Sequence, residues 1–405
     1  MTVKALIFDY KTLLNRPGPE VDALLTWVKS SGLRWCLFST DPLTAAQAGA
    51  YVNAGYPGPD EMIRQSDILS GKRRGSPDWV DAAASRLAVD RHELLYVGCT
   101  ALDWRSAINA GVFYLHAGWA AAQPGGTTSL VSSSPHDVQR ILETFLLAEP
   151  RWSYSVDGPD WSLRSLLPAS AELPCTSPGS TFRLQDVFTY ERPVSIAGGD
   201  ARSHLMLHVL ANAYLEGLLA GSSYFCVYPG SKPGRLNQQL SGYLDKAAAI
   251  VHGYYKDDLL VRTAEAPDTS LLRYHARQSG TTANISIATQ ATTVHLGSAY
   301  RRKLAGKTVI VFDDFTTQGM SLEWARLLLK AAGATHVVML TVGKYGTAHT
   351  SFDLQDDVGF DPFALNVGLT AADFLWTRQD VTVDHGTSPH FGHALSLFIA
   401  ESSAG

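Results

Sequence analysis

The chain has 405 residues, a length that predicts two or three domains at roughly 150 residues each. Hydrophobic residues make up 45% of it and charged residues 18%, so it can bury full-sized cores and does not have the composition of a disordered chain. The formal net charge is −5 and the 33 lysines and arginines form no block, which argues against nucleic-acid binding as the main function.

The first 118 residues alternate short apolar runs with helical patterns, which is typical of a parallel α/β sheet. The strands predicted there are Lys4–Phe8, Trp35–Phe38, Leu94–Val97 and Val112–Leu115. The helices predicted there are Glu20–Ser30, Thr44–Ala54, Asp78–Ala88 and Asp103–Ala110. The composition then changes to Ala, Gly, Ser and Thr, and this change predicts a domain boundary.

A second α/β pattern begins near residue 200, after a helix predicted at Pro135–Leu147. Helices are predicted at Ser203–Ala220, 238–254 and Ser321–Ala332, strands at Tyr224–Tyr228, 257–262, Lys307–Phe312 and His336–Val342, and a mobile loop at Thr263–Thr293. The fold class predicted is α/β, with two doubly wound parallel-sheet domains and a mixed C-terminal segment. The domain limits predicted are 1–118, 119–195 as a linker and hood-like segment, 196–345, and 346–405 as the mixed segment.

The strongest chemical signal is a buried strand that ends in two acids, Asp313 and Asp314. A loop from Phe315 to Gly319 follows and turns into a helix near Ser321. Consecutive amides and hydroxyls at a helix N-terminus form an anion cradle, and glycine permits the close approach of a ligand. Because acids repel a phosphate, they suit ribose hydroxyls or a hydrated Mg²⁺ instead. The segment therefore predicts a site for a sugar 5-phosphate.

This segment resembles the ribose-phosphate signature of type I phosphoribosyltransferases, with Gln318 and Ser321 at positions where threonine is usual. The segment Val227-Tyr-Pro-Gly-Ser231 resembles the pyrophosphate loop of the same family. The resemblance covers about residues 200–345 and implies that the ligand is 5-phosphoribosyl-1-pyrophosphate (PRPP). The PRPP-binding residues that it implies are Thr316, Thr317, Gln318, Gly319, Met320, Ser321, Pro229, Gly230 and Ser231.

The run from Leu260 to Arg277 resembles the basic flexible loop of the competence-protein F branch of the family, although the cysteine cluster usual in that branch is missing. The resemblance implies that Arg273 and Arg277 close over the pyrophosphate as a lid. It also implies that a nitrogenous base displaces pyrophosphate, that Asp313 and Asp314 stabilise the cationic transition state, and that Mg²⁺ bridges the diphosphate and the ribose. Solvated charges on a polar loop are the alternative for the basic run.

The N-terminal motifs resemble those of the haloacid dehalogenase superfamily over residues 1–118. Asp9 stands at the nucleophile position, Ser39 at the phosphate-binding hydroxyl and Asp103 at the metal-binding motif, and the resemblance implies Mg²⁺ held by Asp9 and Asp103. Three positions depart from the pattern. The general acid is replaced by Lys11, the usual lysine by Ser76, with Lys72, Arg73 and Arg74 nearby, and the first acid of the metal motif by Cys99.

These motifs predict a phosphoribosyltransferase fused to a dehalogenase-like domain that removes phosphate from the product, so that the chain would make a nucleoside. Such fusions resemble proteins associated with bacterial stress and tellurium-resistance gene clusters. Two alternatives stay open: a regulatory protein that senses PRPP or nucleotides without turnover, and a phosphatase whose only active domain is the first. The partners predicted are PRPP and a base or nucleotide, with a homodimer possible for this family and no nucleic acid.

The four cysteines lie far apart without a CxxC pair, which argues against a zinc ribbon or a disulfide scaffold and fits a reducing compartment. The sequence has no run of about 18 apolar residues and no export signal at its start. We therefore expect a cytoplasmic protein without a membrane partner.

Overall fold

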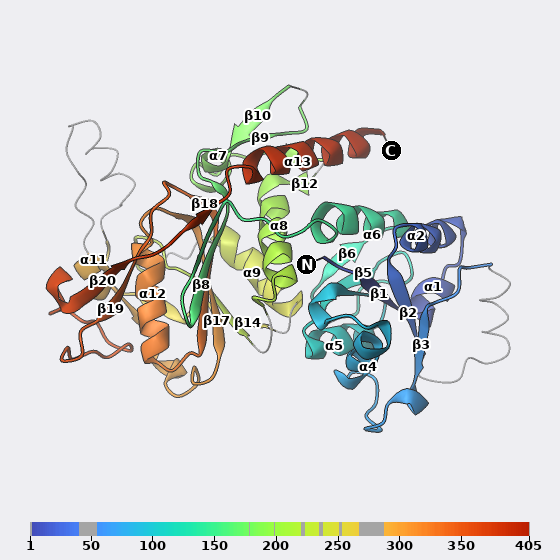
Figure 1. Ribbon diagram of the computed structural model, residues 1–405, viewed down its shortest axis with the longest axis horizontal. Helices are drawn as coiled ribbons and strands as arrows, with labels where there is room; N and C mark the ends of the chain where they lie inside the picture. Colours follow the sequence, from blue (N-terminus) through green and yellow to red (C-terminus); the bar gives the residue numbers. More distant parts are fainter. Residues whose placement is uncertain are drawn as a thin grey trace. The chain divides into compact units, whose positions relative to one another are not determined.

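The computed structural model describes residues 2–39, 55–177, 179–197, 199–219, 223–234, 238–250, 253–266 and 287–404. The chain forms two compact units (Figure 1). Unit 1 comprises Met1–Pro150, Leu210–Ser222 and Lys246–Gly253, and unit 2 comprises Arg151–Val209, Ser223–Asp245 and Tyr254–Gly405. The predicted helix Thr44–Ala54 lies outside the described residues. Most of the predicted loop Thr263–Thr293 does so too.

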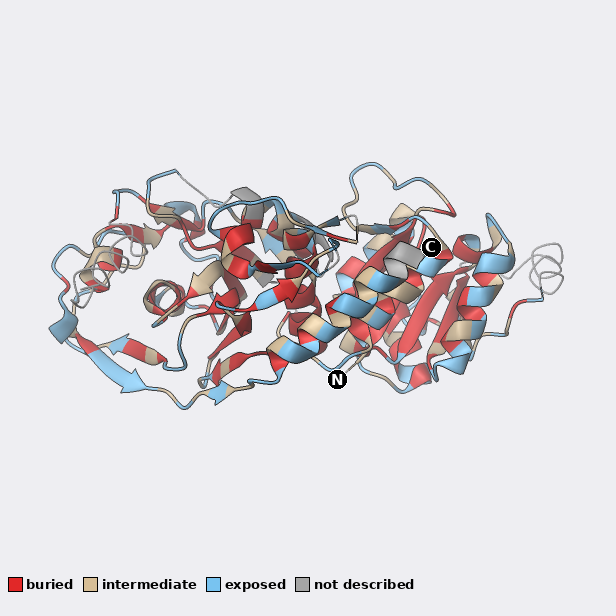
Figure 2. Cartoon of the chain, turned by 90° about the horizontal axis from the view of Figure 1, so that it is seen from above, coloured by how far each residue is buried: buried red, intermediate tan, exposed pale blue. Residues whose placement is uncertain are grey.

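Unit 1 is built on a six-stranded parallel sheet in the order β3-β2-β1-β4-β5-β6. Strands β1, β4 and β5 are buried along their whole length, which is typical of a parallel sheet covered by helices on both faces. Figure 2 shows such strands as buried and the outer faces of the helices as exposed. The strands are β1 (Ala5–Asp9), β2 (Arg34–Ser39), β3 (Glu61–Arg64), β4 (Leu94–Gly98), β5 (Phe113–Ala117) and β6 (Leu130–Ser132).

Two pairs of helices cover this sheet, α2 beside α6 and α4 beside α5. Alternate residues of β1, such as Ala5 and Ile7, pack in one core cluster with Trp79 and Val80 of α4. The long helices are α2 (Pro19–Ser30), α4 (Asp78–Leu87), α5 (Ala101–Ala110) and α6 (Pro135–Ile141), and the short ones are α1 (Tyr10–Leu14), η1 (Gln65–Asp67), η2 (Arg91–Glu93) and η3 (Leu142–Leu146). The strands and helices predicted for this region are therefore confirmed wherever the structure describes them.

The segment 119–195 is divided between the two sheets rather than forming a linker. Its first part adds β6 and α6 to unit 1, because β6 offers β5 a further parallel partner. From Arg151 onward it belongs to unit 2, where β7 and β8 enter the second sheet.

Unit 2 is built on a seven-stranded sheet in the order β14-β13-β17-β18-β8-β7-β21. Strands β13, β17, β18 and β8 run parallel, whereas β7 and β21 add antiparallel pairs at one edge. The strands are β7 (Tyr154–Asp157), β8 (Trp161–Pro168), β13 (Ser223–Val227), β14 (Gly253–Tyr255), β17 (Thr308–Thr316), β18 (His336–Lys344) and β21 (Thr382–Val383). The sheet is thus mixed, with a parallel centre, and the C-terminal segment contributes one of its edge strands.

Within the described residues, unit 2 also contains four two-stranded sheets and several helices. The predicted strand 257–262 is confirmed only in part, because β15 pairs with β16 outside the large sheet. The small sheets are β9 (Glu172–Pro174) with β10 (Thr181–Arg183), β11 (Ser195–Ile196) with β12 (Gly199–Asp200), β15 (Leu260–Arg262) with β16 (Val294–Leu296), and β19 (Thr350–Leu354) with β20 (Phe374–Arg378). The helices are α7 (Leu184–Phe188), α8 (Ala201–Leu215), α9 (Gln238–Ile250), α11 (Ile287–Ala291), η4 (Ser298–Tyr300), α12 (Met320–Ala331), η5 (Ala371–Asp373) and α13 (Thr387–Ala404). Residues 210–215 of α8 and 246–250 of α9 belong to unit 1.

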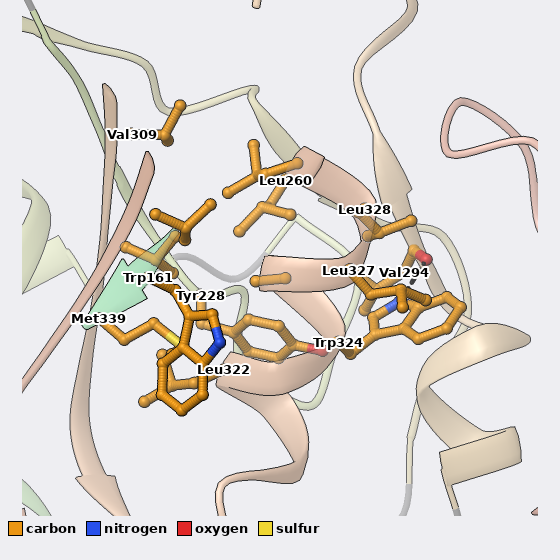
Figure 3. Packing of buried hydrophobic residues seen from close by; sticks show 14 of the residues in the cluster. Trp161, Tyr228, Leu260, Val294, Val309, Leu322, Trp324, Leu327, Leu328 and Met339 are labelled. Atoms are coloured by element: carbon orange, nitrogen blue, oxygen red, sulfur yellow. Dashed lines mark hydrogen bonds between the residues drawn. The ribbon is translucent and has the colours of Figure 1, made fainter. Parts of the chain in front are cut away.

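Helix α12 packs against β17 and β18 of the large sheet and against β16 and β19 of two small sheets. Leu322, Trp324 and Leu328 of this helix lie in one core cluster with Val309 of β17 and Met339 of β18 (Figure 3). The Trp324 indole donates a hydrogen bond of 3.0 Å to the carbonyl oxygen of Val294. This packing fixes the start of α12 relative to the end of β17, and the candidate site lies between those two points. Among the described residues, no helix has the length and apolar character that crossing a membrane requires.

Candidate functional site

The candidate site of unit 2 lies where the parallel strands of its sheet end. The carboxyl ends of parallel strands meet at one edge, and ligands of open α/β sheets bind there. Strand β17 carries Asp313 and Asp314 near its end, and the neighbouring β18 ends at Lys344. The main-chain N–H of Tyr228, directly after β13, donates to the carbonyl oxygen of Phe312 at 2.8 Å. Three segments distant in the sequence therefore converge at this edge.

The two acids lie inside strand β17, and the expectation that the strand ends at them was wrong. The strand continues to Thr316 because β18 also continues, and Phe315 pairs with Gly343 and Thr316 with Lys344. A Cβ atom on Gly343 would lie 2.5 Å from the ring of Phe315, so the absence of a side chain at Gly343 lets that ring lie against β18. The connecting loop is consequently short and comprises residues 317–319.

Asp313 and Asp314 form an interacting pair of partly buried carboxyl groups. Asp313 accepts a hydrogen bond from the main-chain N–H of Asp314 at 3.0 Å, and Asp314 accepts one from Phe315 at 2.7 Å. Burial raises the pKa of both groups, and the neighbouring Asp314 raises the pKa of Asp313 further, while Arg262 opposes this rise. An approaching cation or hydroxyl donor would relieve this repulsion.

The loop after β17 presents main-chain amides at the start of α12. Gly319 has φ +86°, a left-handed conformation that favours glycine, and it precedes the first residue of the helix. The main-chain N–H groups of residues 318–321 donate no hydrogen bond to any residue that the structure describes. A helix N-terminus with unused amides attracts anions, because the amides and the helix dipole both favour negative charge.

A buried lysine contacts the main chain of this loop. The ammonium group of Lys344 donates hydrogen bonds to the carbonyl oxygens of Thr317, Tyr345 (2.8 Å) and Ala348 (3.1 Å), and the residue is only 4% exposed. These hydrogen bonds fix the position of the main chain of the loop. They also place a positive charge next to the loop, which strengthens the attraction of the loop for an anion.

A second buried network supports the helix end of the loop. Glu323, which is fully buried, contacts the His349 ring at 2.7 Å and the Arg326 guanidinium at 2.7 Å. The His349 ring packs against Gly319, where a Cβ atom would lie 2.5 Å from its Cε1 atom. His349 therefore fills the space that a side chain at Gly319 would need.

Arg262, which belongs to the basic run predicted from Leu260 to Arg277, is a further cation near the acids. Its guanidinium, on a residue only 6% exposed, donates to Thr293 at 2.6 Å and to Gln290 at 3.2 Å, and it lies 5.9 Å from the centre of the Tyr228 ring. Tyr228 donates to the same Gln290 side chain at 2.6 Å. This cluster holds the end of β13 in place and opposes the negative charge of Asp313.

The other residues predicted for this site are divided between described and undescribed parts of the chain. Pro229, Gly230 and Ser231 follow β13 directly, and the carbonyl oxygen of Ser231 accepts a hydrogen bond from Ala266 at 2.8 Å. Arg273 and Arg277, predicted as a lid, lie outside the described residues. Thr316, Thr317, Gln318, Gly319, Met320 and Ser321 lie together at the β17–α12 connection.

Replacing Asp313 with Asn is expected to raise the free energy of unfolding of the ligand-free protein near pH 7 by about 1 kcal/mol. A carboxyl whose pKa is raised by folding binds its proton more tightly when folded. The stability that it contributes is present at low pH and is lost as the pH rises from about 4 through the raised pKa. Thermal unfolding between pH 4.5 and 8 measures this, with Asp356→Asn, an exposed acid, as the control. Parallel stability curves for wild type and Asp313→Asn would contradict the raised pKa.

The candidate site of unit 1 lies at the carboxyl ends of β1, β2 and β4. Asp9 ends β1, Ser39 ends β2, and Asp103 lies in the first turn of α5, which follows β4. The structure thus places the three predicted residues at one edge of the sheet, and all three are buried. Asp9 also caps α1, since its carboxylate accepts a hydrogen bond from the N–H of Lys11 at 2.9 Å.

Arg74 joins the two acids of this site. Its guanidinium forms ion pairs with Asp9 through one nitrogen and with Asp103 through the other, and it donates to the Tyr96 hydroxyl at 2.9 Å. The opposite oxygen of Asp103 accepts main-chain hydrogen bonds from Cys99 (2.9 Å) and Thr100 (2.8 Å). Burial raises the pKa of Asp9, and Arg74 opposes this rise.

These residues do not fit the Mg²⁺ site that the motifs imply. Side-chain atoms of Asp9, Cys99 and Asp103 lie within 4.8 Å of one another, but both carboxylates already share Arg74 as their counter-ion. The third group is a thiol, and burial raises its pKa to about 12, so it stays protonated at neutral pH. Mg²⁺ prefers oxygen ligands in near-octahedral geometry, which one thiol and two engaged carboxylates do not supply.

Comparison with family models and with curated proteins found no match. Solved structures do match, over roughly the first third of the chain. The core domain of a protein described as a phosphoglycolate phosphatase from Streptococcus pneumoniae TIGR4 is 21% identical, and the match covers 36% of this chain and 98% of that one with a TM-score of 0.28. CbbY from Rhodobacter sphaeroides, solved with phosphate, is 13% identical, with 34% and 96% covered and a TM-score of 0.28.

A protein described as a haloacid dehalogenase-like hydrolase from Bacteroides fragilis is 21% identical, with a TM-score of 0.24. That match covers 28% of this chain and spans 56% of the length of the other protein. Similarities of this size do not extend to activity. The chemistry of both units therefore has to be inferred from their own side chains.

Proposed function

We propose that unit 2 binds PRPP and transfers its ribose 5-phosphate to a nitrogenous base, with release of pyrophosphate. One observation carries this proposal. A pair of acids with raised pKa values, Asp313 and Asp314, stands directly before a row of main-chain amides at the start of α12 that donate to none of the residues the structure describes. A phosphate suits the amides and a vicinal diol suits the acids, and a ribose 5-phosphate carries both groups a few bonds apart.

The residues beneath the loop support the binding of the 5-phosphate. Lys344 and the N-terminal dipole of α12 both favour a dianion at residues 317–321. The Glu323–His349 pair supports Gly319 and keeps the main chain of the loop in one conformation. A preorganised loop binds its ligand without an additional cost of ordering.

The acids would act on the sugar ring during the reaction. A ring nitrogen of the base forms a bond to C1 of the ribose while the bond from C1 to the pyrophosphate oxygen breaks. Pyrophosphate leaves with the electron pair, and the ring nitrogen releases its proton to solvent. Positive charge develops on the ribose, and carboxylates near the hydroxyls stabilise it. Two adjacent oxygen donors whose repulsion a cation relieves also fit Mg²⁺, and Asp313 and Asp314 would hold it. When bound, Mg²⁺ supplies positive charge for the pyrophosphate.

Calorimetric titration with PRPP and Mg²⁺, together with pyrophosphate release from PRPP and a panel of purine and pyrimidine bases, tests the proposal. We expect Asp313→Asn/Asp314→Asn to lose at least about 100-fold in pyrophosphate release. The matched control is Asp356→Asn/Asp357→Asn, which changes an exposed pair of adjacent acids in the same unit. A wild-type protein that does not bind PRPP, or equal losses in both variants, would contradict the proposal.

The same measurements separate a transferase from a PRPP sensor. Tight binding of PRPP without pyrophosphate release from any base would favour a regulatory protein that keeps the PRPP site.

A phosphatase in unit 1 is the second candidate, because Asp9, Ser39 and Asp103 lie together at one edge of its sheet. Phosphate release from a nucleotide or a sugar phosphate would then survive Asp313→Asn and disappear in Asp9→Asn.

A further inference from the structure

The buried charges of unit 1 are balanced by an arginine of the chain itself. Asp9 is 1% exposed and Asp103 is fully buried, so two negative charges lie in a region that water does not reach. Charges buried in this way are stable only when an opposite charge or hydrogen bonds compensate them. Arg74, which is 7% exposed, contacts both carboxylates and supplies this compensation.

Arg74 is held in this position by contacts along its length. The Tyr96 hydroxyl accepts a hydrogen bond from it, and the Phe38 ring lies 5.8 Å from its guanidinium carbon. The next residue, Gly75, is fastened to α5, because its N–H donates to Ser106 at 3.0 Å and its carbonyl accepts from Asn109 at 2.6 Å. The side chain and the adjacent main chain are therefore both fixed, unlike a surface arginine that exchanges partners.

A cysteine lies beside the two acids that Arg74 joins. Ligand atoms of Asp9, Cys99 and Asp103 lie within 4.8 Å of one another, close enough to share one cation. With Arg74 between the two carboxylates, a divalent cation would meet one fixed positive charge, two carboxylates that are already paired and one thiol. Repulsion from the guanidinium and the loss of its ion pairs both oppose binding of the metal.

We infer that Arg74 takes the place of a divalent cation in unit 1, and that Asp9, Cys99 and Asp103 form a latent metal site that opens only when Arg74 is removed. Unit 1 then folds and keeps its charge balance without metal. Any phosphate release by this unit would be independent of divalent cations as well.

Binding of Mn²⁺ to the full chain tests the inference, measured by the electron paramagnetic resonance signal of free Mn²⁺ and by the shift in the melting temperature. The measurements are made in an Asp313→Asn/Asp314→Asn background, so that the acids of unit 2 do not contribute. We expect Mn²⁺ neither to bind unit 1 with Arg74 present nor to shift its melting temperature. Arg74→Ala is expected to bind one equivalent and to gain at least about 3 °C from saturating Mn²⁺, in line with stabilisation by a ligand of the native state.

Two further variants identify the site and control for the loss of a charge. Arg74→Ala/Asp103→Asn should lose the Mn²⁺ binding of Arg74→Ala. Arg73→Ala, which removes the neighbouring exposed arginine, should behave like the parent, which is the Asp313→Asn/Asp314→Asn protein with Arg74 present. Binding of Mn²⁺ to the parent that disappears on Asp9→Asn would overturn the inference, and this measurement does not require any Arg74 variant to fold. An Arg74→Ala protein that folds and binds no Mn²⁺ would overturn the latent site.

Discussion

Arg74→Met is expected to lower the free energy of unfolding of unit 1 by about 3–5 kcal/mol near pH 7, because it leaves two buried carboxylates without their counter-ion. The exposed neighbour provides the control, and Arg73→Met should change stability by less than about 0.5 kcal/mol. Urea unfolding, followed by the fluorescence of tryptophans such as the buried Trp79, measures both variants. A loss below 1 kcal/mol in Arg74→Met would show that the carboxylates are not compensated mainly by this arginine.

The loss in Arg74→Met should also depend on pH in a defined direction. Burial already raises the pKa of Asp9, and Arg74 is the main group that opposes this rise. Without Arg74 the pKa of Asp9 rises further. A carboxyl with a raised pKa contributes stability at low pH and loses it as the pH rises through the raised value. The difference between wild type and Arg74→Met should therefore shrink from pH 7 towards pH 4, and a constant difference would contradict this explanation.

Gly319→Ala is expected to reduce the stability of unit 2 more than Gly346→Ala does. Both glycines have positive φ, +86° and +69°, so an alanine at either position carries a backbone penalty of about 1–2 kcal/mol. Only at Gly319 does the new Cβ meet a neighbour, 2.5 Å from the buried His349 ring, whereas nothing lies within 4 Å of a Cβ at Gly346. His349 cannot move away easily because Glu323 holds it.

We therefore expect Gly319→Ala to destabilise unit 2 by about 3 kcal/mol and to weaken PRPP binding at least tenfold, through displacement of the amides at the start of α12. Gly346→Ala should lose stability only through the backbone penalty, and its affinity for PRPP should not change. Thermal unfolding and calorimetric titration of the two variants measure the difference. Equal losses of stability and affinity would show that the contact with His349 does not shape the loop.

Local patterns predicted four of the strands in residues 1–118 and the parallel strands β13, β17 and β18 of unit 2, but not β3, β7 or β8. Strands such as Leu94–Gly98 are short apolar runs, and α5 is marked by a capping box in which the Thr100 and Asp103 side chains each bond to the main chain of the other. The strand before Asp313 was also predicted, but its end was not. Its last residues pair with β18, and the length of that partner cannot be read from the residues of β17.

The composition of residues 119–195 misled the prediction of domains for a similar reason. Small and polar residues indicate a linker, yet β6 joins the first sheet and β8 pairs with β18, about 175 residues further along the chain. Whether a short run such as Leu130–Ser132 becomes a strand depends on whether a neighbouring strand offers an open edge. That information lies in the fold of the rest of the sheet.

The sequence by itself determined the acids and the small-residue loop of unit 2 and the positions of Asp9, Ser39 and Asp103. These residues lie near the ends of their strands or in the connections that follow, and strand order carries them to one edge of a sheet. Only the tertiary structure decided what surrounds them. Arg74 reaches Asp9 across 65 positions, and His349 reaches Glu323 across 26. Charge compensation and close packing act through space, so a short motif cannot specify which distant side chain provides them.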